Sequence, residues 1–245
     1  MLPITPINTQ SRSFALHPVM GTLQTMFNTD RRLAIVPNMG PLPRPTTKAQ
    51  YGQASCPKPA SHFSHKDQQN TWQALGAEGV TRGWGGRTGD ALAALNTCTA
   101  FTSVSAAGNA LRHVDTTLGA LNARNSVTAF TAFTASDFGR TFTFTSNGDG
   151  TDHGWGSHHL VMGGAVKGGD LYGRSPTVGL TNSSNNNRDS SSDQLGNGAM
   201  LPEQSMDHLG ASLGRWFGVS DTGLADIFPK LANFDAAKRD LGFMG

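Results

Sequence analysis

Residues 127–135 read Val-Thr-Ala-Phe-Thr-Ala-Phe-Thr-Ala, and residues 136–140 continue with Ser-Asp-Phe-Gly-Arg. The first segment is rich in β-branched and aromatic residues, which is the composition of a buried β-strand. Asp137 follows this predicted strand directly, and open α/β sheets bind their ligands at the carboxyl ends of strands. Val127–Ala135 is therefore expected to be an interior strand of a sheet, with Asp137 at a ligand site.

Further strands and helices are predicted on both sides of this segment. Leu33–Val36 is a short apolar run that predicts a buried strand, ending at Pro37 because proline has no N–H for a central strand. Thr141–Thr145 alternates Thr with Phe before an Asn-Gly turn, as in a hairpin, whereas the pattern of His158–Val166 fits a strand and a helix equally. Helices are expected at His17–Phe27, Ser64–Leu75, Arg87–Leu95 and Met206–Phe217, with a short one after Ser220. Strands that alternate with helices predict an α/β fold with a mostly parallel central sheet flanked by helices.

The composition predicts one globular domain over residues 1–245. Charged residues make up 15% of the chain, below the usual share of about a quarter, and the Ser- and Asn-rich residues 182–197 are expected to form a mobile surface loop. A net charge of +2 without any basic run gives no support to nucleic-acid binding. No apolar stretch reaches the length of about 20 residues that a transmembrane helix needs, and the first residues lack the features of a signal peptide.

A glycine-rich segment after the predicted hairpin gathers residues that bind metals. Asp152, His153, His158 and His159 lie in it, and three histidines within seven residues are unusual in a chain that has 8. Aspartate and histidine together suit zinc or manganese. A single aspartate at a strand end is most often a helix cap and a single loop histidine is most often only solvated, so it is the cluster that favours a site. Asp137 and either His153 or His158 are expected to approach within roughly 3–5 Å of each other, the span of two ligands on one ion.

Three stretches of this region resemble the signature of a known bacterial family. They read Thr-Ala-Ser-Asp-Phe-Gly-Arg-Thr (134–141), Gly-Thr-Asp-His-Gly-Trp-Gly-Ser-His-His (150–159) and Gly-Gly-Ala-Val-Lys-Gly-Gly (163–169). The family is domain of unknown function 1501, a branch of the alkaline phosphatase and sulfatase superfamily. Residues 38–42, 63–72 and 215–219 agree with it, so the resemblance extends over nearly the whole chain.

The resemblance implies an alkaline phosphatase-like fold and hydrolysis of phosphate or sulfate esters with two divalent ions, zinc or manganese, about 4 Å apart. It places a nucleophile at Ser64, at the start of a predicted helix whose N-terminus favours anions. It places metal ligands at Asp137 and His153, with Asp152 and His158 as neighbouring candidates, and Arg140 beside the oxygens of a small anionic ester. Relatives are often exported, so the resemblance also implies a periplasmic or secreted location.

The sequence departs from this family in ways that bear on activity. The Gly-Gly-Asn-Asp motif of an early strand is missing. Where relatives have the metal-binding Asp-Thr-His motif, Asp115 is followed by two threonines, so only Asp115 remains there as a candidate metal ligand. The chain is therefore interpreted as a shortened or internally deleted member, with exposed sheet edges that favour self-association. Ser64 and Asp67 also match a helix capping box. Three functions remain open: a metal-dependent hydrolase, a one-metal binding protein, and a scaffold without catalysis.

Overall fold

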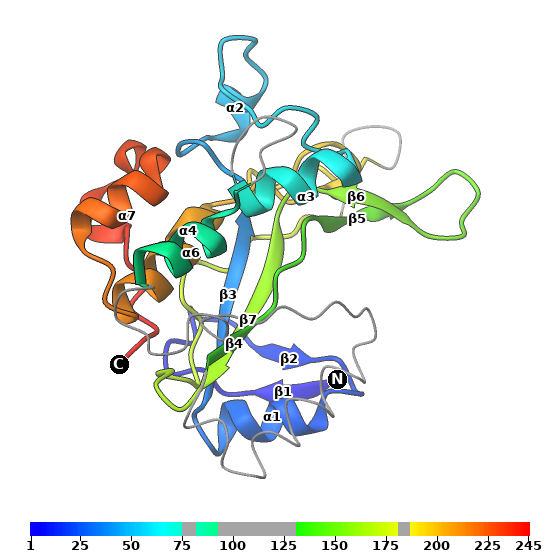
Figure 1. Cartoon of the computed structure of the whole chain (residues 1–245). Coiled ribbons are helices and arrows are strands. Elements are labelled where there is room, and N and C mark those ends of the chain that lie inside the picture. Colours follow the sequence, from blue (N-terminus) through cyan, green and yellow to red (C-terminus); the bar gives the residue numbers. More distant parts are fainter. Residues whose placement is uncertain (75–81, 93–130, 181–186) are drawn as a thin grey trace.

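The computed structural model describes residues 1–74, 82–92, 131–180 and 187–245 of the chain (Figure 1). The central element is a mixed sheet in the order β4-β7-β3-β8. It contains β4 (Thr131–Phe133), β7 (Ser157–Gly163), β3 (Leu33–Gly40) and β8 (Gln204–Ser205). The strand β7 is antiparallel to both β3 and β4, whereas β8 runs parallel to β3. The α/β class agrees with this structure, but the expectation of a mostly parallel sheet was wrong.

The two faces of the sheet carry separate clusters of apolar side chains. Along β3, Ala34 and Val36 belong to one cluster, while Leu33 and Ile35 belong to the other, as the period of two in a strand requires. The second cluster is closed by α1 (Gly21–Asn28) and by the ribbon of β1 (Leu2–Ile4) and β2 (Phe14–Leu16). Because both faces are covered, β3 is buried along its whole length.

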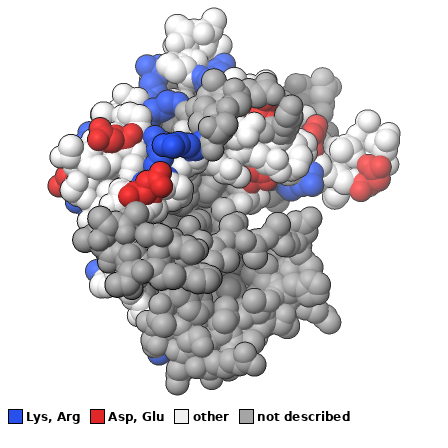
Figure 2. All heavy atoms as spheres, viewed as in Figure 1, with Lys and Arg blue, Asp and Glu red and all other residues white. Residues whose placement is uncertain are grey.

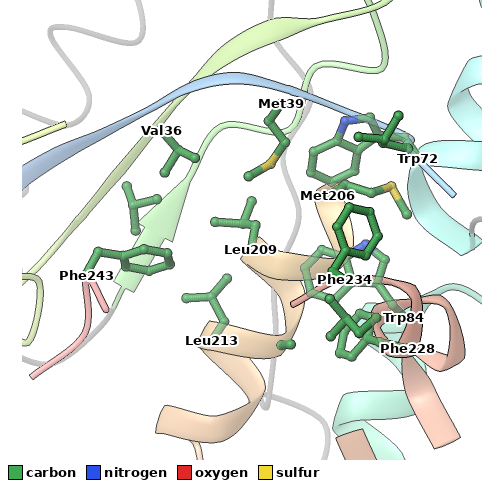
Figure 3. Close-up of a cluster of buried hydrophobic side chains, with 14 of the residues drawn as sticks. Val36, Met39, Trp72, Trp84, Met206, Leu209, Leu213, Phe228, Phe234 and Phe243 are labelled. Atoms are coloured by element: carbon green, nitrogen blue, oxygen red, sulfur yellow. The ribbon is translucent and has the colours of Figure 1, made fainter. Parts of the chain in front are cut away.

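The first cluster is built around α6 (Met206–Trp216). Figure 3 shows Leu209 and Leu213 pointing towards Val36 of the sheet, with the rings of Trp84 and Phe228 at the other side. The helices α4 (Trp84–Leu92) and α7 (Asp221–Ile227) pack beside α6. The predicted helix was therefore confirmed.

The spacing of Met206, Leu209, Leu213, Trp216 and Phe217 predicts one apolar stripe along this helix, but the last turn of α6 differs from it. Trp216 and Phe217 are 37% and 47% exposed, and their rings meet edge to face with centres 4.7 Å apart. The chain turns back directly after them, and Leu224 of α7 covers α6 at Gly214 instead. The stripe thus ends one turn earlier than the spacing predicted.

Pro37 lies inside β3 and does not end it. The register of β3 against β7 shifts between Val36 and Met39, which marks a bulge, and Asn38 has a φ of 49°. A bulge leaves a residue without its ladder hydrogen bond, so a proline is tolerated there. The expected end of the strand at Pro37 was wrong because the sequence pattern did not show this bulge.

The segment Val127–Ala135, expected as an interior strand, contains a short strand at the end of the described sheet. Its residues 127–130 lie outside the described part, and β4 comprises only Thr131–Phe133. Among the described strands β4 is the last of its sheet and pairs with β7 alone. Phe133 is 39% exposed and packs against the ring of Trp84 at 5.9 Å. The aromatic residue thus covers the margin of the sheet, and the interior position was wrong for the described strands.

A hairpin of β5 (Gly139–Phe144) and β6 (Thr151–Gly154) extends from the body of the molecule (Figure 1). Its turn is closed by the Thr145 N–H, which donates to the carbonyl of Gly150 at 2.8 Å, and Gly148 adopts a φ of 69°. The hairpin predicted from the alternating Thr and Phe was therefore confirmed. The root of this hairpin lies beside α3 (His65–Ala74).

The remaining described elements are α2 (Lys48–Tyr51) and three 3₁₀ segments at Gly196–Gly198, Pro229–Asn233 and Ala236–Lys238. The expected mobile loop lies partly outside the described residues. From residue 187 onwards it is fixed by hydrogen bonds, since both nitrogens at the end of Arg174 donate to the carboxylate of Asp193 at 2.7 and 2.9 Å. None of the described helices has the length and apolar character needed to cross a bilayer.

Candidate functional site

The candidate site begins at the N-terminus of α3. Ser64 directly precedes the helix, and its Oγ accepts a hydrogen bond from the Asp67 N–H at 3.4 Å. The carbonyl of Ser64 accepts from the Gln68 N–H at 2.9 Å, which is the first bond of the helix. Ser64 therefore occupies the capping position that the sequence predicted. The buried Gln68 side chain donates to the carbonyl of Gly154 at 3.4 Å and so fixes α3 to the hairpin root.

The hairpin brings residues from two of the resembling stretches together. Arg140 of β5 stands opposite His153 of β6, and Gly139 stands opposite Gly154. Gly139 must be glycine, because a Cβ there would collide with the backbone of Gly156. Asp137 lies just before β5, so the pairing places it at the same root of the hairpin as His153.

His65, the first residue of α3, is the direct partner of Asp137. The imidazole Nδ1 lies 2.9 Å from the carboxylate Oδ2, with side chains that are 54% and 20% exposed. Oδ2 itself is buried and receives no hydrogen bond of good geometry within the described residues. On the other edge of the ring, Nε2 lies 3.3 Å from the Nε2 of the exposed Gln69. The imidazole and the carboxylate are therefore in close polar contact without a hydrogen bond of good geometry.

His153 completes the cluster. Its Nδ1 lies 3.0 Å from the carbonyl oxygen of Phe63. Its ring lies 5.8 Å from that of His65 and 4.3 Å from that of Phe138, measured between ring centres. The structure thus brings His65, Asp137 and His153 to one place, which we call the His65 cluster. The sequence had singled out Asp137 and His153 but had missed His65.

The other residues singled out from the sequence make their contacts elsewhere. The Asp152 Oδ1 accepts a hydrogen bond from the backbone N–H of His153 at 2.8 Å. The guanidinium of Arg140 lies 5.2 Å from the centre of the Phe138 ring and donates to the carbonyl of Thr151 at 2.8 Å. Asp115 lies outside the described residues.

The remaining histidines of the motif stabilise the sheet. The Nδ1 of His158 accepts from the Asn38 N–H at 3.0 Å, so it binds the bulge of β3. His159 is fully buried, its Nδ1 lies 3.0 Å from the carbonyl oxygen of Thr134, and burial lowers its pKa to about 4. A histidine that stays neutral in the core suits packing rather than catalysis near neutral pH.

The metal ligands expected from the sequence do not gather into one group within the described part of the chain. Within it, no group of three or more His, Cys, Asp or Glu side chains has a geometry that could hold a metal ion. What the His65 cluster does offer is an imidazole in contact with a carboxylate, with a second imidazole beside it, next to the capped end of a helix.

The fold and this cluster define an α/β protein with a histidine- and aspartate-containing site at the root of a hairpin. Residues 106–227 match the model of a family described as "Protein of unknown function (DUF1501)". The match includes Asp137, Arg140 and His153, but it begins after Ser64 and His65. No curated protein and no solved structure matches the chain. Because His65 lies outside the matched range, only its place after Ser64 at a predicted helix start marked it in the sequence.

Proposed function

We propose that the chain is a hydrolase of phosphate or sulfate esters that acts at the His65 cluster. The observation that carries the proposal is the 2.9 Å contact between the His65 Nδ1 and the Asp137 Oδ2. A carboxylate next to Nδ1 favours the tautomer whose Nε2 can accept a proton, as in the general bases of hydrolases, and the Gln69 amide nitrogen, which can only donate, lies beside that Nε2 at 3.3 Å. The exposed edge of His65 leaves that atom within reach of a substrate.

Each neighbour of His65 has a role in this proposal. The Nε2 of His65 takes a proton from the attacking water or from the Ser64 hydroxyl, and returns it to the ester oxygen that leaves. The N-terminus of α3 and the guanidinium of Arg140 favour the anionic group of the substrate. A divalent ion, where one is held, adds positive charge for the same anion.

Hydrolysis of aryl phosphate and aryl sulfate by the purified chain tests the proposal. We expect slow turnover, lowered at least tenfold by His65→Ala and by Asp137→Asn, with and without added zinc or manganese. The matched control is His62→Ala. It removes an imidazole three residues from His65 whose Nε2 is hydrogen-bonded to the Tyr51 hydroxyl at 2.9 Å. Turnover that is the same in His65→Ala and in wild type would show that the activity, if any, arises elsewhere.

One observation favours a protein without catalysis. The Ser64 hydroxyl caps α3, and Arg140 donates to the hairpin backbone, so both side chains have structural roles already. A scaffold that keeps the family's fold would look the same in these two respects. Absence of turnover on both ester classes, in protein whose melting is cooperative, would select this second function.

A further inference from the structure

We propose that a small cavity between α4 and α6 binds a tetrahedral oxyanion such as sulfate or phosphate. We call it the Asp207 cavity, and its lining is Ala74, Arg87, Asp207, Ile227, Pro229 and Lys230. Three of these residues carry ionisable side chains, and they come from α4, from α6 and from the 3₁₀ segment Pro229–Asn233.

The Asp207 cavity is separate from the His65 cluster. Ala74 is the last residue of α3, whereas His65 is the first. The nine positions between them (74 minus 65) correspond to about 14 Å along the helix, at a rise of 1.5 Å per residue. The inference therefore goes beyond the proposed function and does not rest on it.

The first argument concerns the carboxyl group of Asp207. This residue is only 3% exposed. Within the described part of the chain, its carboxyl group makes no hydrogen bond and no ion pair, and Lys230 and Arg87 act on it only through their charges. A buried polar group without a partner destabilises a fold. Because Asp207 lines a cavity, a group bound in that cavity can supply the missing partner.

The second argument concerns the two cations. The Arg87 Nε is buried and has no hydrogen-bond partner among the described residues, and its Nη1 approaches the carbonyl of Asp226 only at 3.5 Å. A guanidinium with donors to spare suits an oxyanion. An amine in the cavity would face the like charges of Arg87 and Lys230, whereas an anion faces opposite ones. Figure 2 shows Lys and Arg atoms gathered near α4 on the face that carries α4 and α7.

The third argument concerns size. The volume of the Asp207 cavity is about 60 Å³. A water molecule needs roughly 10–15 Å³ of such space, so the cavity holds roughly four to six waters, or one ion that replaces them. The four oxygens of a tetrahedral anion can accept from Arg87 and Lys230 together and still reach Asp207. A planar carboxylate has two oxygens and leaves one of these groups without a partner.

The bound anion requires a proton on Asp207. Burial raises the pKa of this carboxyl to about 7, and the protonated form donates to an anion that the ionised form repels. The other groups near it keep one charge state between pH 5 and pH 8. Arg87 and Lys230 stay cationic, Asp226 of α7 is exposed, and burial lowers the pKa of His208 to about 4, so that this imidazole stays neutral.

Calorimetric titration with sodium sulfate at constant ionic strength tests the inference, because sulfate itself does not titrate in this range. We expect one equivalent to bind, about tenfold more weakly at pH 8 than at pH 6, with uptake of one proton at pH 8. Arg87→Gln and Lys230→Gln should each weaken binding at least tenfold. Asp207→Asn should have the opposite effect, binding at pH 8 as tightly as wild type does at pH 6 and without a dependence on pH, since an amide can donate at any pH.

Two matched controls distinguish the cavity from other sites of anion binding. Arg82→Gln removes an exposed cation five positions before Arg87, and His65→Ala removes the centre of the candidate active site. Both variants should bind sulfate as wild type does. If Arg87→Gln does not melt cooperatively, Lys230→Gln and Asp207→Asn carry the test. Absence of saturable sulfate binding, binding that the folded cavity variants leave unchanged, or binding that His65→Ala abolishes overturns the inference, and acetate that binds as tightly as sulfate overturns the choice of a tetrahedral anion.

Discussion

Gly210 offers a sharp test of how tightly the main core is packed. It lies in the middle of α6, where alanine normally stabilises a helix by roughly 0.5–1 kcal/mol relative to glycine. A Cβ at this position would lie 2.6 Å from Cε1 and Cζ of Phe228 and 3.2 Å from Cε3 of Trp84. Phe228 is 1% and Trp84 8% exposed, so neither ring can move out into solvent. Overpacking of this kind costs about 1–3 kcal/mol, which exceeds the gain in helix propensity.

We therefore expect Gly210→Ala to lower the free energy of unfolding by about 1–2 kcal/mol. Equilibrium unfolding in urea, followed by circular dichroism, measures this change. Gly89→Ala in α4 is the matched control, since no atom lies within 4 Å of a Cβ there. It should raise stability by roughly 0.5–1 kcal/mol, the propensity difference alone. A Gly210→Ala protein as stable as the Gly89→Ala protein would refute the close contact of α6 with Phe228.

Two further predictions concern Asp207 and Ser64. Burial raises the pKa of Asp207 to about 7, against the opposing charges of Lys230 and Arg87. This pKa lies above the value of 3.8 for the unfolded carboxyl, so the folded state holds the proton more tightly, and the free energy of unfolding should fall as the pH rises from about 4 to about 7. Asp207→Asn should remove that fall between pH 5 and pH 8, as measured by urea unfolding. An unchanged dependence of stability on pH in the variant would contradict the prediction. Ser64→Ala should cost about 1 kcal/mol while Ser64→Asp is tolerated, since either oxygen can cap α3; melting curves that do not distinguish the two would exclude the cap.

The elements that depend on local spacing were predictable from the sequence. Met206, Leu209 and Leu213 predict α6, and the alternating Thr and Phe of residues 141–145 predict the hairpin. The direction of the strands was not predictable in the same way, because strand composition reports burial and not the neighbour. The strand β7 follows a hairpin and returns antiparallel to β3, which makes the sheet mixed.

The candidate site was predictable only in part, for a related reason. Asp137 and His153 stood out because they lie in one motif, close together in the sequence. His65 pairs with Asp137 across 72 positions (137 minus 65), and no local pattern reports such a contact. The motif also overstated the site, since His158 accepts a hydrogen bond from the backbone of Asn38 and the buried His159 lies against the carbonyl of Thr134. Residue type and sequence spacing indicate candidate ligands, whereas the register of the paired strands determines which side chains face one another.

The bulge of β3 links the fold to the site. At Asn38 the backbone N–H donates to the Nδ1 of His158 at 3.0 Å, and the side-chain nitrogen donates to the carbonyl of Leu201 at 2.7 Å. The same side chain approaches Gly156 so closely that a Cβ there would lie 2.4 Å from the Asn38 Oδ1. Residues 155–156 connect β6 to β7, so the bulge sets where the hairpin leaves the sheet. Without the bulge, the connection from β6 to β7 would be displaced, and His153 would move away from His65. The hydrogen bond that Pro37 cannot donate to the ladder is therefore compatible with the site, because it falls at the bulge.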